Sequence, residues 1–432
     1  MNTIRLTPPT GKINAEIAIP GSKSYTNRAL IMASLSTGES VLSGISKSAD
    51  TMILINVLCK LGVGISINRN EIKIKGNGGR FLPFDGTLNV GAAGTAMRFL
   101  TALCCLVPGC IILDGSSRMR QRPIADLVMT LRTLGAKITY LINEGFPPIK
   151  IKGGQIDGRH VKINSSLSSQ FITALLLIGP VLPKGLQIQI SGKPVSQSYI
   201  DMTIDGLMQF GITVTNHNYQ QYTITQKQTY QKTRYHIEGD VTGANYFWAL
   251  AAVNGGTVKV KNINPQTSQG DIKFLAILKK MGCIVTLDRQ NQWIEVTGNE
   301  NLQALQSDMT GLPDSAQTLA IVAAFAKGKT IITGLSTLRI KETDRIVAVQ
   351  NELKKMGIKT ESGDDWLLIH GGKPHGAIID AYGDHRMAMS FAIAGAKIPG
   401  IEIKEPEVVN KSFPDFWEKI QETGIKIKEN CD

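Results

Sequence analysis

Positively charged side chains stand where the first predicted helix begins. An alternating run over residues 13–19 predicts a strand, and Pro20-Gly21 separates it from a buried helix. Lys23 and Arg28 lie at the start of this helix. The N–H groups of a first helical turn and the positive end of the helix dipole favour a bound anion. The stretch therefore fits an anion site, and it equally fits a surface turn whose serines serve only as caps.

Cations recur at later helix entrances, at Arg122, Lys341, Arg345, Arg386 and Lys411. Arg122 directly precedes a proline, which keeps it out of the α region and suits a bidentate grip on carboxylate or phosphate. Lys341 and Arg345 lie where the helix dipole disfavours cations, and an anionic ligand would remove that conflict. The alternative is a solvated turn of mixed charge. Together, the cations would line a cleft suited to two small anions.

Neutral polar groups mark other helix starts. Gly94 allows a ligand to approach the backbone closely, although a glycine needed only for helix packing fits as well. Ser168-Ser169-Gln170 supplies more hydroxyl and amide groups than one cap needs, and it could bind a phosphate with neutral donors. Ser196 stands at the entrance of the next amphipathic helix.

A carboxylate, Asp314, opens a very apolar helix. From the local sequence, a helix N-cap is the stronger interpretation. A partly desolvated carboxylate that faces a cleft could instead act as a general base. His385 also lies at a helix start, where a lone histidine is more often structural than catalytic.

The elements that must position these residues repeat six times. An amphipathic helix ends at a glycine and leads into two alternating strands, and the glycines are spaced by 67 to 76 residues. They are Gly62, Gly135, Gly211, Gly282, Gly357 and Gly424. An earlier, almost wholly apolar helix in each unit is predicted to be buried. The sequence therefore predicts an α/β protein of six strand–helix–strand–helix–strand–strand units, three per domain.

The two domains are predicted to divide at two crossovers, near residues 20–21 and 238–241. One domain would hold residues 21–240, and the other would hold residues 1–20 together with 241–432. Clefts at domain interfaces often hold small ligands, and paired crossovers could act as a hinge. We therefore expect the helix entrances of both domains to line one site that closes on its substrate.

The composition argues against several classes of protein. Lys and Arg outnumber Asp and Glu by 47 to 35, an excess that suits anionic substrates. This excess is not gathered in a tail and aromatic residues make up only 6%, which argues against nucleic-acid binding. The sequence shows no histidine spacing typical of a metal site and no secretory signal. The most apolar window, over 171–182, is too short to span a membrane, so we expect a cytoplasmic protein.

The cysteines form no CxxC pair, and most of them lie in apolar runs. This pattern indicates reduced core residues in a cytosolic protein. The six are Cys59, Cys104, Cys105, Cys110, Cys283 and Cys431.

Six short motifs, in order along nearly the whole chain, resemble the family of 5-enolpyruvylshikimate-3-phosphate synthases. They are Pro20-Gly21-Ser22-Lys23, Gly94-Thr95-Ala96-Met97-Arg98, Arg122-Pro123, Ser168-Ser169-Gln170, Lys341-Glu342-Thr343-Asp344-Arg345 and Asp384-His385-Arg386-Met387-Ala388-Met389. The resemblance implies the enolpyruvyl transferase-like fold, which has two domains of three repeated units and two crossovers. Ala92 and Thr337 depart from the family pattern, which often has Asn at both positions.

The resemblance also implies the reaction. The enolpyruvyl group of phosphoenolpyruvate passes to the 5-hydroxyl of shikimate 3-phosphate, and phosphate leaves. The family works through a tetrahedral intermediate, uses neither a metal nor an organic cofactor, and is usually monomeric. By this resemblance, Asp314 is expected to deprotonate the 5-hydroxyl. Glu342 and Lys23 are expected to handle proton transfer at the methylene carbon and the bridging oxygen.

Two sets of binding residues follow from the resemblance. Shikimate 3-phosphate is expected to contact Lys23, Ser24, Arg28, Ser168, Ser169, Gln170, Ser196, Asp314 and Lys341. Phosphoenolpyruvate is expected to contact Lys23, Gly94, Arg122, Gln170, Arg345, Arg386 and Lys411.

Other functions stay open from the sequence. The related transferase that acts on UDP-N-acetylglucosamine usually has a reactive cysteine before its Arg-Pro, and the loop 114–121 has none. A nucleic-acid-binding relative without transferase activity would need a continuous basic stripe or stacking aromatics, and neither is evident. An inactive relative that only binds shikimate 3-phosphate is opposed by the presence of Asp314, Glu342 and Lys23.

Overall fold

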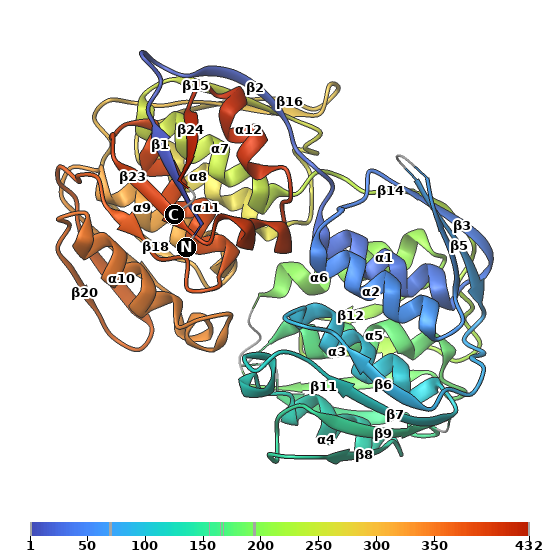
Figure 1. Ribbon diagram of the computed structural model, residues 1–432. Coiled ribbons are helices and arrows are strands. Elements are labelled where there is room, and N and C mark those ends of the chain that lie inside the picture. The colour runs from blue at the N-terminus through green and yellow to red at the C-terminus, as the bar shows by residue number, and fades with distance from the viewer. Residues whose placement is uncertain are drawn as a thin grey trace. The chain divides into compact units, whose positions relative to one another are not determined.

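The computed structural model describes residues 2–68, 71–154, 156–164, 166, 168–192 and 196–430, without the side chain of Asn430. The chain divides into two compact units (Figure 1). We call Gly21–Ile237 the N-terminal unit, and Met1–Pro20 with Glu238–Asp432 the C-terminal unit. The second boundary of these units lies three residues before the expected division at 240/241.

Within the described residues, each unit contains three four-stranded sheets of one design. In every sheet one outer strand runs parallel to its neighbour, and the other neighbours are antiparallel. The sheets of the N-terminal unit, in spatial order, are β14 (Arg234–His236), β3 (Thr37–Ser43), β5 (Glu71–Asn77) and β4 (Gly64–Ile67); β6 (Gly86–Asn89), β7 (Gly109–Asp114), β9 (Ile149–Gly153) and β8 (Lys137–Tyr140); and β10 (His160–Asn164), β11 (Leu186–Ser191), β13 (Gln221–Ile224) and β12 (Thr215–His217).

The C-terminal unit repeats this design. Its sheets are β2 (Asn14–Ala18), β15 (Thr257–Lys261), β17 (Trp293–Thr297) and β16 (Ile284–Asp288); β18 (Gln306–Asp308), β19 (Lys329–Thr333), β21 (Trp366–His370) and β20 (Thr360–Ser362); and β22 (Ile378–Ile379), β23 (Ile401–Lys404), β1 (Thr3–Thr7) and β24 (Lys426–Asn430). The predicted α/β fold of six repeated units is confirmed.

The first residues of the chain complete sheets built mostly from its second half. β1 pairs with β23 and β24, and β2 pairs with β15, so both dark-blue strands lie among yellow to red elements (Figure 1). In the N-terminal unit, β14 closes the first sheet against β3. The two crossover segments meet where the Asp240 N–H donates to the Pro20 carbonyl at 2.9 Å.

Alternating side chains put one face of each sheet on a hydrophobic core. In β10, Val161 and Ile163 are buried, whereas the residues on either side of them are exposed. In β15, Val258 and Val260 are buried in the same way. A strand with this period of two belongs to a sheet that has one covered face.

The first helix of each repeat is buried on nearly all sides. These helices are α1 (Lys23–Leu35), α3 (Gly94–Leu103), α5 (Ser169–Ile178), α7 (Val241–Asn254), α9 (Ala316–Ala324) and α11 (His385–Ala392). In the N-terminal unit α1, α3 and α5 contact one another, and in the C-terminal unit α9 contacts α7 and α11. Their apolar sequences suit this position, and most of the predicted site residues lie near their first turns.

The second helix of each repeat ends at a glycine in the left-handed region. These helices are α2 (Ala49–Lys60), α4 (Ala125–Thr133), α6 (Gln197–Gln209), α8 (Phe274–Lys280), α10 (Arg345–Lys355) and α12 (Phe416–Glu422). The six predicted glycines have φ between 77° and 103°, which confirms their position just past the helix ends. The 3₁₀ helices are η1 (Cys104–Leu106), η2 (Met119–Gln121), η3 (Gly179–Val181), η4 (Gly270–Lys273), η5 (Pro313–Ser315), η6 (Ser336–Ile340), η7 (Ile393–Ala396) and η8 (Pro406–Lys411).

The cysteines only partly follow the core prediction. Cys104, Cys105 and Cys283 are free and buried, but Cys59 is exposed and Cys110 is half-buried. The core interpretation is wrong for the last two, because Cys59 lies on the outer side of α2 and Cys110 on the less buried face of β7. Cys431 lies outside the described residues.

None of the helices that the structure describes is both long and apolar enough to cross a membrane. Across the same residues, no group of three His, Cys, Asp or Glu side chains is arranged to hold a metal ion.

Candidate active site

A buried arginine organises the charged residues of the C-terminal unit. Arg345 begins α10, and its side chain is 1% exposed. Its guanidinium nitrogens lie 3.1 Å from Asp314 Oδ1, 3.0 Å from Glu342 Oε2 and 2.7 Å from Asp384 Oδ2. The three carboxylates come from η5, from the residues just before α10 and from the start of α11. Arg345 therefore joins η5, the residues just before its own helix and the start of α11.

Three carboxylates keep Arg345 charged despite its burial. Burial alone would lower its pKa, but Asp384, Glu342 and Asp314 outweigh burial and raise the pKa above its ordinary value. The sequence suggested that an anionic ligand removes the conflict between this cation and the helix dipole. For Arg345 that argument does not hold, because the protein's own carboxylates already supply the negative charge.

The N-cap interpretation of Asp314 is wrong. Asp314 lies within η5, α9 begins two residues later, and no side-chain capping bond from a described residue is made there. Instead, Asp314 Oδ2 lies 3.0 Å from Arg386 Nη2, while Oδ1 faces Arg345. The Asp314 side chain is 15% exposed. Two guanidiniums thus hold the Asp314 carboxylate in place, and solvent can still reach it.

Glu342 bridges the cluster to a lysine. Its Oε1 lies 3.7 Å from Lys411 Nζ, and the two side chains are 13% and 12% exposed. Lys411 is the last residue of η8, and Lys341 directly follows η6, where it is half-buried. The structure therefore brings Glu342 and Lys411 together with Arg345. Lys341 is the residue directly before Glu342.

Two members of this cluster were not among the predicted site residues. Asp384 caps α11 by accepting the Arg386 N–H at 2.9 Å, and its carboxylate is fully buried. Tyr246, in the middle of α7, accepts from Arg386 Nη1 at 3.3 Å, and burial raises the pKa of this tyrosine to about 12. An acidic residue at a helix start was a usable signal for Asp384. Nothing in the apolar sequence of α7 marks Tyr246.

In the N-terminal unit, Lys23 pairs with a carboxylate. Lys23 begins α1, which Ser22 caps by accepting the Tyr25 N–H at 3.5 Å. Lys23 Nζ lies 3.1 Å from Asp50 Oδ2 in the first turn of α2. The two side chains are 14% and 5% exposed, so the pair is largely shielded. Asp50 was not predicted, because it lies 27 residues away in an ordinary helix start.

Arg28 is held by neutral groups. Its guanidinium donates to the Ser24 carbonyl at 2.9 Å, to Thr203 Oγ1 at 2.8 Å and to the Tyr199 carbonyl at 2.9 Å. The ring of Phe99 lies 5.6 Å from the guanidinium carbon. Burial lowers the pKa of Arg28 to about 10, an effect that nearby tyrosines oppose. Among the described contacts of Arg28 there is no carboxylate, so its buried positive charge is not neutralised by an ion pair there.

The Arg122 guanidinium fills the space that a side chain at position 94 would need. Gly94 begins α3, and a Cβ atom at this position would lie 2.6 Å from Arg122 Nη1. Arg98 donates to the Gly94 carbonyl at 3.2 Å and to the Pro123 carbonyl at 3.0 Å, so it ties the two segments together. Arg122 is 8% exposed. The glycine therefore makes room for a predicted site arginine, which neither sequence interpretation of Gly94 anticipated.

The serine-rich stretch forms the start of α5. Ser168 caps this helix by accepting the Gln170 N–H at 3.2 Å, and Ser169 is its buried first residue. Gln170 Nε2 donates to Thr95 Oγ1 at 3.4 Å, which brings the starts of α3 and α5 together. Ser196 precedes α6 with a positive φ of 53°.

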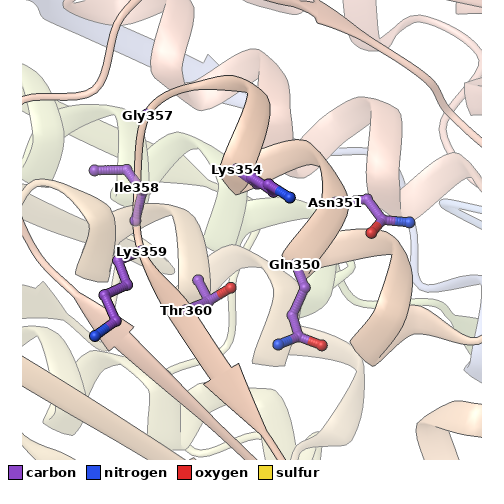
Figure 2. A pocket seen from close by; sticks show the side chains of 7 residues that line it. All are labelled: Gln350, Asn351, Lys354, Gly357, Ile358, Lys359 and Thr360. Carbon is purple, nitrogen blue, oxygen red and sulfur yellow. The ribbon is translucent and has the colours of Figure 1, made fainter.

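A surface pocket lies toward the C-terminal end of α10, the helix that Arg345 begins. It has a volume of about 560 Å³ and follows the end of α10 into β20 (Figure 2). Its lining residues are Gln350, Asn351, Lys354, Gly357, Ile358, Lys359 and Thr360. None of the predicted site residues is among them.

Comparisons with known proteins decide the family. The family model described as EPSP synthase (3-phosphoshikimate 1-carboxyvinyltransferase) matches residues 7–420. The chain belongs to this family. Within the EPSP synthase family, a 3-phosphoshikimate 1-carboxyvinyltransferase of Salmonella arizonae is 42% identical over 417 residues, which cover 95% of this chain and 97% of the relative. One of Salmonella paratyphi A is 42% identical over 418 residues, with the same coverage.

Solved structures agree with this membership. The structure of an EPSP synthase from Acinetobacter baumannii aligns with this chain at a TM-score of 0.84 and 26% identity, and the alignment covers both chains fully. A second structure of the Acinetobacter baumannii enzyme has a TM-score of 0.81 at 25% identity. The predicted family and the enolpyruvyl transferase-like fold are confirmed, and the UDP-N-acetylglucosamine alternative is not favoured.

Proposed function

We propose that the chain is an enzyme that transfers the enolpyruvyl group of phosphoenolpyruvate to the 5-hydroxyl of shikimate 3-phosphate, with release of phosphate. The observation that carries the proposal is the Asp314 carboxylate between Arg345 and Arg386, beside the Glu342–Lys411 pair, in a chain of this family. This step belongs to the shikimate pathway of aromatic amino acid biosynthesis.

Asp314 is the proposed base. It takes the proton of the 5-hydroxyl as that oxygen bonds to C2 of phosphoenolpyruvate. Glu342, with Lys23, supplies a proton to the methylene carbon in this addition and removes a proton in the elimination. The C2–O bond to phosphate then breaks as Lys23 gives a proton to the bridging oxygen, and the double bond of the enolpyruvyl product forms again. Proton exchange with solvent then restores Asp314 and Lys23. Because Glu342 contacts Arg345 and Lys411, cations lie where negative charge develops on the carboxylate.

The two substrates carry phosphate and carboxylate groups that match the cationic residues. For shikimate 3-phosphate we propose contacts to Lys23, Ser24, Arg28, Ser168, Ser169, Gln170, Ser196, Asp314 and Lys341. For phosphoenolpyruvate we propose contacts to Lys23, Gly94, Arg122, Gln170, Arg345, Arg386 and Lys411. The proposed reaction needs neither a metal nor an organic cofactor. We further propose a cytoplasmic monomer that does not bind nucleic acid.

Phosphate release from phosphoenolpyruvate tests the function directly. We expect release with shikimate 3-phosphate as acceptor and none with UDP-N-acetylglucosamine. Release with the sugar nucleotide alone would contradict the proposed acceptor. If a protein whose folding is verified by circular dichroism releases no phosphate with either acceptor, the transferase function itself is contradicted.

A further inference from the structure

A chain of hydrogen bonds reaches the proposed base from the interior of the C-terminal unit. Asn245 Nδ2, in α7, donates to Ser315 Oγ at 2.7 Å, and the Ser315 hydroxyl donates to Asp271 Oδ1 at 2.5 Å. Asn245 Nδ2 also lies 3.2 Å from the Asp271 carbonyl, which accepts from it. Ser315 directly follows Asp314 in η5. The backbone that carries the base is therefore tied to α7 and to η4.

All three members of this chain are buried. Asn245 and Ser315 are fully buried, and Asp271 is 4% exposed. Among the described residues, Asp271 makes no ion pair with a cation, so its main partner is the Ser315 hydroxyl. A buried carboxylate that makes no direct ion pair is costly, and no acidic side chain is needed to cap α8, which begins at Phe274. The cost points to a role beyond packing.

We propose that Asp271 is a positioning residue for Asp314, which it holds through Ser315. The inference rests on the proposed function, because it assigns Asp271 to the same reaction. The Ser315 hydroxyl donates to Asp271 and accepts from Asn245, and these two bonds hold the backbone of η5 in one position. That arrangement aims the Asp314 carboxylate at Arg345 and Arg386. Small displacements of a reacting group are enough to lower a catalytic rate.

The charge of Asp271 also acts on the base. The pKa of Asp271 is raised to about 6, mainly by burial; the charges of Asp314 and Asp240 add to the rise, and the Ser315 hydroxyl and Arg386 oppose it. Above that pH Asp271 is ionised, and its negative charge favours proton uptake by Asp314. Below that pH Asp271 is neutral and this assistance is lost. Ionisation of Asp271 should therefore contribute to the acid limb of the pH profile.

Substitutions at Asp271 and Ser315 separate these effects. In Asp271→Ala and Ser315→Ala we expect kcat per folded enzyme to fall on the order of 10- to 100-fold, with the KM for phosphoenolpyruvate unchanged. Asp271→Asn keeps an acceptor for Ser315 but lacks the negative charge, so its kcat above pH 7 should lie between those of Asp271→Ala and the wild type. Its acid limb should move to lower pH, because the ionisable group is gone. Thr318→Val, which removes another buried hydroxyl near the start of α9, is the matched control.

The outcomes distinguish this inference from the proposed function. Turnover by the wild-type chain with shikimate 3-phosphate tests the function and comes first. With that turnover established, a folded Ser315→Ala enzyme with wild-type kcat would overturn the positioning role, even if Asp271→Ala fails to fold. An Asp271→Asn enzyme whose pH profile matches that of the wild type would overturn the electrostatic role.

Discussion

The two units hold their buried arginines in opposite ways. In the C-terminal unit, Arg345 contacts three carboxylates, and Arg386 contacts Asp314. In the N-terminal unit, Arg28 and Arg98 donate to hydroxyl and carbonyl oxygens and to a methionine sulfur. Neutral acceptors satisfy the donors of a guanidinium but leave its positive charge uncompensated. Among its described contacts Arg28 has no carboxylate partner, which suits the anion-binding role that we propose for it, whereas Arg345 and Arg386 fix the carboxylates that we propose as proton-transfer groups.

Loss of the Glu342 carboxylate should have the largest effect. Glu342→Gln preserves the size of the side chain but removes the carboxylate that we propose for proton transfer, so we expect kcat to fall about 10²- to 10⁴-fold. Substrate dissociation constants should change little, because the neighbouring cations stay in place. Steady-state kinetics and calorimetric titration measure the two quantities. Glu361→Gln, at an exposed glutamate of the same unit, is the control, and equal kcat values in the two variants would remove Glu342 from the reaction.

Arg345 should matter for stability as well as for activity. Arg345→Met leaves three carboxylates close together with their shared cation gone, so we expect the free energy of unfolding to fall by about 3–5 kcal/mol. Urea unfolding followed by fluorescence measures this loss. Arg5→Met removes an arginine whose side chain is 55% exposed, so this control should cost less than about 1 kcal/mol. A similar loss in both variants would contradict the central position of Arg345.

Arg28 should prove less costly to disturb, because its partners are neutral and several. Thr203→Val keeps the shape of the side chain but removes the acceptor for Arg28 Nε, and we expect a loss of about 1.5–3 kcal/mol. Thr101→Val is the control, since among the described residues the Thr101 hydroxyl bonds only to the Met97 carbonyl within its own helix. Thermal unfolding compares the two. If Thr203→Val costs no more than the control, the threonine does not hold the guanidinium.

The comparison of the units also shows what the sequence could predict. The six repeats follow from local signals, namely the glycine past each second helix and the alternating strands after it. The cations at helix entrances were equally visible. Their partners were not, because Asp384 lies 39 residues from Arg345 and Asp50 lies 27 residues from Lys23. Pairing across such distances depends on how the helices pack, so the sequence predicted where the charges lie and not which of them neutralise each other.

Gly94 gives the smallest expected effect and the sharpest test of the N-terminal unit. A methyl group in Gly94→Ala would lie 2.6 Å from Arg122 Nη1, which is the flexible end of a long side chain. The fold should absorb this contact by moving the guanidinium, so the free energy of unfolding should stay near that of the wild type. The KM for phosphoenolpyruvate should nevertheless rise about tenfold, which corresponds to roughly 1.4 kcal/mol of lost interaction.

The matched control for this substitution lies in the other unit. Gly243 occupies the first turn of α7, and a Cβ there would meet the Phe413 ring at 3.4 Å, an ordinary contact. Gly243→Ala should leave the KM for phosphoenolpyruvate unchanged. If Gly94→Ala also leaves it unchanged, Arg122 either does not bind phosphoenolpyruvate or binds it in a position that the methyl group does not reach. Arg122→Ala distinguishes the two, because only in the first case would this truncation leave the KM at its wild-type value.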